Sequence, residues 1–142
     1  MILVIAEQRE GKLNRATWET IAAAQQLAGV APAPITVLVP GAKAAAAGAD
    51  VAAAQVAEVV TLDDAALEPY TADGYTAALQ AAIGQLNPTF VLLPHTYQTR
   101  DFAPKLAARL DRALITDVTG IKAVGGQPAF VRPMFQGKLT AD

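Results

Sequence analysis

Residues 2–40, ILVIAEQREGKLNRATWETIAAAQQLAGVAPAPITVLVP, predict a strand, a helix and a second strand in succession. The runs at residues 2–6 and 35–39 are almost continuously apolar, which is typical of strands buried on both faces of a parallel sheet. The alanine-rich residues 15–28 favour a helix, and Asn14 is its candidate N-cap. This unit predicts an α/β domain with a mostly parallel sheet.

The same alternation of strand and helix continues to residue 110. We expect helices at residues 42–54, 72–86 and 102–110, and strands at residues 56–62 and 89–94. The alanine-rich sequence at the first of these helices could be of low complexity. A close-packed helix is favoured, because alanine is the strongest helix former and its small side chain lets a helix lie close to a sheet.

The last third of the chain changes character after Leu110. Residues 113–138 contain three extended runs without a helical period, and Gly125 and Gly126 are expected to form a hairpin turn. We therefore predict antiparallel C-terminal strands on a parallel core, within a three-layer single domain that covers residues 1–142. That length suits one hydrophobic core.

The composition excludes several classes of protein. The 142 residues carry a net charge of -2, which leaves no basic surface for nucleic acid, and they include no cysteine for disulfides, thiolate metal sites or cysteine nucleophiles. No apolar run approaches the roughly 18 residues that a membrane helix needs, so membrane insertion is not expected. The first strand follows Met1 without a signal-peptide pattern, so we expect a cytoplasmic protein.

Ligands of open parallel sheets bind beyond the carboxyl ends of the strands, so the loops there are the candidate sites. Glu7 and Arg9 follow the first strand, where a solvated connection is favoured over a site. Gly41 follows the second, where its N–H could bind an anion, although a tight turn is favoured. Neither a P-loop nor the Gly-x-Gly-x-x-Gly fingerprint is present.

The loop after residue 94 has the composition of a functional segment. It presents His95, Thr96 and Arg100 at the carboxyl edge of the sheet, where they could form a ligand-binding crevice or a protein interface. The single histidine is expected to be a hydrogen-bonded loop residue. Thr99 and Asp101 are expected to cap the following helix. The sequence offers no paired nucleophile, so we do not expect an enzyme, and a small hydrolase or transferase is the least favoured alternative.

The final run, FVRPMFQGKLTAD at residues 130–142, places Arg132 between apolar neighbours. An arginine in such a strand needs a partner, and an intramolecular salt bridge and an interface contact are equally favoured.

Three segments together resemble the α subunit of electron transfer flavoproteins. They are ILVIAEQREGKLNRATWETIAAAQQLA at residues 2–28, LLPHTYQTRDFAPKLAARLDRALITDV at 92–118 and FVRPMFQGKLTA at 130–141. Lys138 departs from the asparagine that the family often has there, and we count it with His95, Thr96, Arg100 and Arg132 as a possible interface or crevice residue.

The resemblance implies a Rossmann-like fold of the adenine-nucleotide-hydrolase type and a role as the subunit's N-terminal domain. In that family the α subunit pairs with a β subunit, and the heterodimer carries electrons from dehydrogenases, such as the acyl-CoA dehydrogenases of fatty acid β-oxidation, to a quinone oxidoreductase. FAD would be held mainly by a C-terminal domain expected after residue 142, so no cofactor is expected on this segment. The protein would be a bacterial, cytoplasmic electron carrier, and the alternative is an autonomous adenine-nucleotide-binding module.

Overall fold

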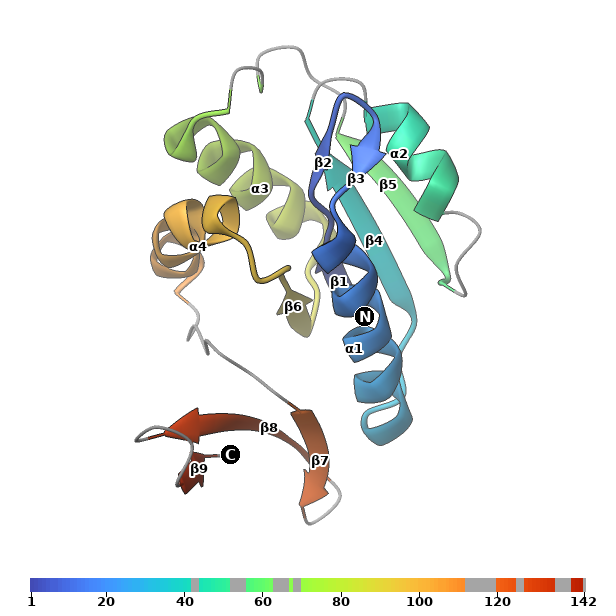
Figure 1. The fold of residues 1–142 in the computed structure, drawn as a ribbon, viewed down its shortest axis with the longest axis vertical. Coiled ribbons are helices and arrows are strands. Elements are labelled where there is room, and N and C mark those ends of the chain that lie inside the picture. Colours follow the sequence, from blue (N-terminus) through green and yellow to red (C-terminus); the bar gives the residue numbers. More distant parts are fainter. Residues whose placement is uncertain are drawn as a thin grey trace.

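Four parallel strands form the centre of the structure, which is a computed structural model (Figure 1). In the order in which they pair, they are β5 (Glu58–Leu62), β4 (Ile35–Pro40), β1 (Ile2–Ile5) and β6 (Phe90–Leu92). The structure describes residues 1–41, 44–51, 56–62, 67, 70–111, 120–124, 127–134 and 139–141, and it describes side-chain surroundings as far as residue 111. The predicted parallel core is confirmed.

Helices cover both faces of this sheet. On one face lie α1 (Arg15–Val30) and α2 (Ala44–Val51), and on the other lie α3 (Ala72–Leu86) and α4 (Tyr97–Leu110). A short hairpin of β2 (Gln8–Arg9) and β3 (Lys12–Leu13) connects β1 to α1. Among the described residues, no helix combines the length and the apolar character that a membrane crossing requires.

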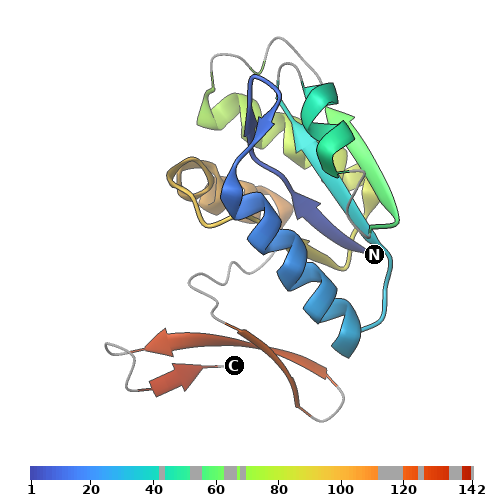
Figure 2. The ribbon, with the colours of Figure 1, turned by 45° about the vertical axis from the view of Figure 1, so that its right-hand side comes forward.

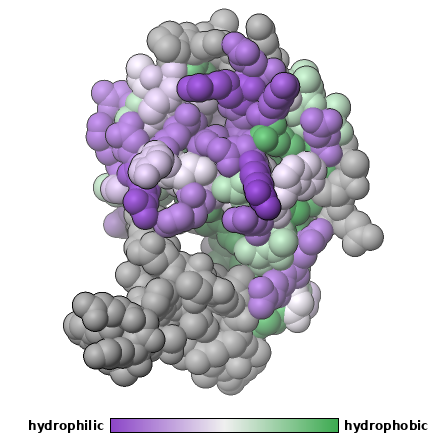
Figure 3. All heavy atoms as spheres, in the orientation of Figure 1, coloured by the Kyte–Doolittle hydropathy of each residue, from purple (hydrophilic) through white to green (hydrophobic). Residues whose placement is uncertain are grey.

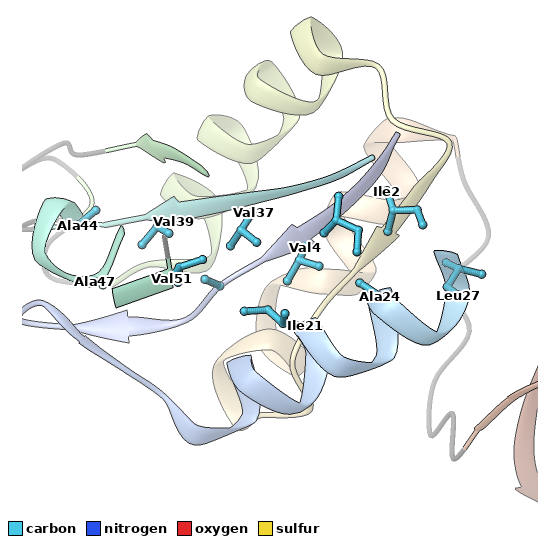
Figure 4. Packing of buried hydrophobic residues seen from close by; sticks show 12 residues of the cluster. Ile2, Val4, Ile21, Ala24, Leu27, Val37, Val39, Ala44, Ala47 and Val51 are labelled. Carbon is cyan, nitrogen blue, oxygen red and sulfur yellow. The ribbon is translucent and has the colours of Figure 1, made fainter. Parts of the chain in front are cut away.

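The strand β1 supplies apolar side chains to both layers. Ile2 and Val4 lie over α1, as Figure 4 shows, in an apolar cluster that extends to α2, whereas Leu3 and Ile5 belong to the cluster with α3 and α4. All four side chains are at most 1% exposed. Two separate cores therefore lie on either side of one sheet, which is why the sequence of this strand does not alternate between apolar and polar residues.

Helix α2 lies very close to the sheet, as its alanine-rich sequence predicts. A Cβ atom built on Gly48 would lie 2.7 Å from Cγ2 of Thr61 in β5. The buried side of the helix consists of Ala44, Ala47, Gly48 and Val51. Small residues on this side allow the close approach.

Helix α4 begins five residues before the predicted start, and this corrects two assignments. Its N-cap is Thr96, whose hydroxyl oxygen accepts a hydrogen bond from the Thr99 N–H at 3.1 Å. Thr99 and Asp101 therefore lie inside the helix and do not cap it. The helix forms ahead of Pro104 because the Thr96 cap satisfies an N–H of its first turn.

The C-terminal strands form a separate antiparallel sheet (Figure 2). It consists of β7 (Gly120–Val124), β8 (Gln127–Met134) and β9 (Leu139–Ala141), and β7 and β8 contact α1. Val124 pairs with Gln127, so two residues separate the paired positions, as the predicted hairpin turn requires. Gly125 and Gly126 themselves lie outside the described residues.

Candidate functional site

The candidate site lies where the order of the strands reverses. From β1 the chain proceeds to β4 and β5 on one side, and it later returns to β6 on the other side of β1. In open α/β sheets the crevice beyond the carboxyl ends of two such strands is the usual ligand site. Here the loop after β1 contains Glu7, and the loop after β6 contains His95 and Thr96.

A single carboxylate bridges this crevice. Oε1 of Glu7 accepts a hydrogen bond from the Thr96 hydroxyl at 2.6 Å, and Oε2 accepts one from the Asn14 amide at 2.9 Å. Thr96 is the N-cap of α4, and Asn14, as predicted, is the N-cap of α1. Glu7 thus joins the first turns of two helices that cover opposite faces of the sheet.

The backbone of Glu7 is held as firmly as its side chain. Its N–H donates to the hydroxyl of the fully buried Thr17 at 3.0 Å, and its carbonyl accepts from the Asn14 N–H at 2.7 Å. The expectation of a merely solvated connection is therefore wrong for Glu7. Arg9 is exposed on β2, in agreement with that expectation.

Gly41 forms part of a tight turn and does not present its N–H to an anion. Its φ is +118°, and its N–H donates to the carbonyl of Leu62 at 3.1 Å. A Cβ atom at this position would lie 2.6 Å from Nε2 of Gln8. The same Nε2 donates to the carbonyl of Pro40, so Gln8 packs across the turn. The close approach and the positive φ explain the glycine.

An open hollow of about 240 Å³ lies at the start of α4. Its lining residues are His95, Thr96, Tyr97 and Arg100, and we call it the α4 hollow. Nη2 of Arg100 donates to Nε2 of His95 at 3.2 Å, so the histidine is hydrogen-bonded, as predicted. Tyr97 stands out from the surface with 89% of its area exposed.

The carboxylate of Asp101 is hydrogen-bonded to Tyr70 and not to the neighbouring Arg100. Its Oδ2 accepts a hydrogen bond from the Tyr70 hydroxyl at 2.7 Å. Burial, together with this bond, raises the pKa of Tyr70 above its ordinary value, so the phenol remains a donor at neutral pH. Tyr70 in turn packs edge-on against Tyr75, with ring centroids 4.9 Å apart. Asp101 is thus bound to the neighbouring α3 layer.

Among the residues that the structure describes, no group of acidic, histidine or cysteine side chains could hold a metal ion. The described crevice is thus an internal hydrogen-bonded junction with an open hollow beside it.

A family model gives this fold its context. The model for the electron transfer flavoprotein domain matches residues 2–142. The chain belongs to the electron transfer flavoprotein domain family. The resemblance seen in the three sequence segments is confirmed, and so is the Rossmann-like α/β fold that it implies.

Relatives of this electron transfer flavoprotein domain include subunits of several bacterial proteins. It is 36% identical over 137 residues to the electron transfer flavoprotein subunit alpha of Bacillus subtilis, covering 96% of this chain and 42% of that protein. The Pseudomonas aeruginosa subunit alpha is 35% identical over 141 residues, covering 99% and 43%. The LctC subunit of the Acetobacterium woodii lactate dehydrogenase (NAD(+),ferredoxin) is 27% identical, covering 99% and 34%. The chain therefore spans less than half the length of these relatives.

The structure brings three of the five predicted site residues of this electron transfer flavoprotein domain together. His95, Thr96 and Arg100 line one hollow. Arg132 lies on β8 opposite Ala141, and the structure describes its backbone only. Lys138 lies outside the described residues. The prediction that these two join the crevice or an interface is untested.

Sequence analysis missed Tyr97 and the bond between Glu7 and Thr96. Placing the start of α4 at Phe102 left Tyr97 in a loop, and recognising Thr96 as an N-cap would have put Tyr97 at the exposed first position of the helix. No local signal connects Glu7 to Thr96, because 89 positions separate them.

Proposed function

We propose that this chain is the N-terminal domain of the α subunit of a heterodimeric electron transfer flavoprotein, where it acts as a scaffold that binds the β subunit. The observation that carries the proposal is the family match over residues 2–142, together with relatives named subunit alpha. Those relatives are more than twice as long as this chain. A C-terminal domain following residue 142 in the longer protein is part of the proposal.

The whole carrier would accept electrons from dehydrogenases and pass them to a quinone oxidoreductase in the bacterial cytoplasm. One relative is itself named as a subunit of a lactate dehydrogenase, which supports a dehydrogenase as the electron donor. The donor named in our prediction, an acyl-CoA dehydrogenase, remains one member of that class. In this role the subunit is a carrier and not a catalyst by itself.

The α4 hollow does not fit FAD. The α4 hollow measures about 240 Å³ and is open, which is below the roughly 300–1,000 Å³ of sites that enclose organic ligands. In the neighbouring crevice the Thr96 hydroxyl already donates to Glu7, so a pyrophosphate could bind it only by breaking that hydrogen bond. We therefore assign the flavin to the rest of the longer subunit.

The same geometry makes an autonomous adenine-nucleotide-binding module the weaker alternative. That alternative relied on the Gly41 turn and on the loop after β6. The Gly41 N–H donates a hydrogen bond to the carbonyl of Leu62. In the loop after β6, the Thr96 hydroxyl donates to the carboxylate of Glu7. Neither donor is available to a phosphate without breaking an internal hydrogen bond.

Calorimetric titration of residues 1–142 separates these possibilities. With FAD and with AMP we expect no heat of binding up to millimolar ligand, while the full-length subunit with its β subunit retains flavin through gel filtration. Stoichiometric FAD on residues 1–142 would refute the assignment of the flavin to another domain. Micromolar binding of AMP would instead favour the nucleotide-binding module.

A further inference from the structure

We propose that the α4 hollow is a docking site for an acidic side chain of the β subunit, with Arg100 binding the carboxylate and Tyr97 packing against the surface around it. This inference rests on the proposed function, because it assumes a β subunit as partner. It adds the surface and the chemistry of recognition, which the family match does not supply.

The charge of Arg100 is not neutralised within the described chain. Its guanidinium is hydrogen-bonded to Nε2 of His95 and to no described carboxylate. The ion pair that the described residues do form, between Lys105 and Asp73, lies further along the same helix. A guanidinium has five N–H donors, so most of those on Arg100 remain available for a planar acceptor.

Two described carboxylates that lie close to this surface, those of Glu7 and Asp101, are already engaged. Glu7 accepts from Thr96 and Asn14, and Asp101 accepts from Tyr70. Both acids are thus held in internal hydrogen bonds. The first turn of α4 adds the positive end of a helix dipole beside the guanidinium. A carboxylate supplied from outside is therefore the complementary group.

Tyr97 is the most exposed large side chain with apolar character in the described chain, at 89%, and Trp18 follows at 41%. Tyrosine and arginine are the residue types most often found at the energetic centres of protein interfaces. Here they lie three positions apart on one helix, so both belong to the same turn. An exposed aromatic side chain beside a cation that pairs with no described carboxylate favours a protein partner.

The open shape of the surface also favours a side chain over a small ligand. The hollow is open, and among its described lining residues Arg100 is the one that carries a permanent charge. Hydrophilic side chains cover much of the coloured part of the molecular face in Figure 3. A carboxylate fixed on a folded partner needs only one such charged contact, because the rest of the interface holds it in place.

Binding of the full-length α subunit to its β subunit tests the proposal. The dissociation constant is measured by surface plasmon resonance for wild type and for Arg100→Glu, Arg100→Lys and Tyr97→Ala. Arg109→Glu is the matched control, because Arg109 is an exposed arginine in the last turn of the same helix. Circular dichroism of each variant verifies that it is folded.

We expect Arg100→Glu and Tyr97→Ala to weaken binding by about 30-fold or more, as substitutions at the energetic centre of an interface do. Arg109→Glu should change the dissociation constant by less than about threefold. Arg100→Lys keeps the charge but loses the planar fork, so an intermediate loss of about fivefold is expected. Added salt should weaken wild-type binding more than binding by Arg100→Glu.

The outcomes separate this inference from the function on which it rests. If wild-type α subunit does not bind the β subunit at all, the proposed function fails and the docking site fails with it. If it binds and Arg100→Glu binds equally well, only the docking site is refuted. Titration of the unassembled α subunit with inorganic phosphate is a further check. Saturable binding that Arg100→Glu abolishes would reassign the hollow to a small anion and overturn the proposal.

Discussion

Replacing Glu7 by alanine should separate the first turns of α1 and α4 and lower the free energy of unfolding by about 1.5 kcal/mol. The partly buried bond from Thr96 should contribute about 1 kcal/mol, and the exposed bond from Asn14 roughly half of that. For a chain of this length such a loss corresponds to a fall of roughly 3–6 °C in the melting temperature.

A double-mutant cycle isolates the bond across the crevice. Glu7→Ala, Thr96→Ala and the double variant are unfolded in urea and followed by circular dichroism. Thr96→Ala alone should cost more than the bond to Glu7, because it also removes the cap on Thr99. The coupling energy between the two sites should be about 1 kcal/mol, since their atoms are in direct contact.

Conservative variants provide the controls. Thr96→Ser keeps both the hydroxyl and the cap, so it should stay within about 0.5 kcal/mol of wild type. Glu7→Gln keeps an acceptor for Thr96 but loses the negative charge, so its loss should be smaller than that of Glu7→Ala. A coupling energy below about 0.3 kcal/mol would refute the reasoning, because separate sites then account for both effects.

Three further predictions concern packing and titration. Gly84→Ala in α3 should raise the free energy of unfolding by about 0.5–1 kcal/mol, since no atom lies within 4 Å of the new Cβ. Gly48→Ala in α2 should lower it by about 1 kcal/mol, because the new Cβ would clash with Thr61 of β5. Equal effects of the two substitutions in urea unfolding would contradict the close packing of α2. Leu79 is 0% exposed, so Leu79→Ala should lower the free energy of unfolding by about 2–5 kcal/mol in the same assay. Leu79→Met should lower it by less than about 1.5 kcal/mol. Similar losses for both variants would contradict a filled core. Burial and Asp101 raise the pKa of Tyr70. The difference in free energy of unfolding between wild type and Tyr70→Phe should therefore be constant below about pH 10 and decline above it. A decline that begins near neutral pH would contradict a raised pKa.

The elements that sequence analysis located correctly are those with strong local signals. The apolar runs that became β1 and β4 could hardly be anything but buried strands. The helix α3 matches its predicted bounds of residues 72–86, because its apolar residues recur every three or four positions. At the candidate site, the position of His95, Thr96 and Arg100 at the carboxyl edge followed from the parallel topology.

The features that could not be predicted depend on contacts between distant segments. Glu7 looked like a solvent-exposed loop residue because its partner Thr96 belongs to another strand. The start of α4 was placed too late because Thr99 and Asp101 were expected to cap the helix, whereas its N-cap is Thr96. The C-terminal strands were expected on the parallel core, and nothing in their sequence shows that β7, β8 and β9 pair only with one another in the described structure.

The double-sided burial of β1 has a consequence for how the sheet aligns its strands. A slip of one residue would exchange Ile2 and Val4 for other aliphatic side chains and would expose no polar group, so hydrophobicity alone does not distinguish the correct alignment. Such a slip would move Glu7 by about 3.3 Å, which is enough to break its contacts with Thr17 and Thr96. Glu7, two residues beyond the end of the strand, therefore fixes the alignment of β1. The aliphatic residues of the strand are free to interchange over evolution as long as the contacts of Glu7 are kept.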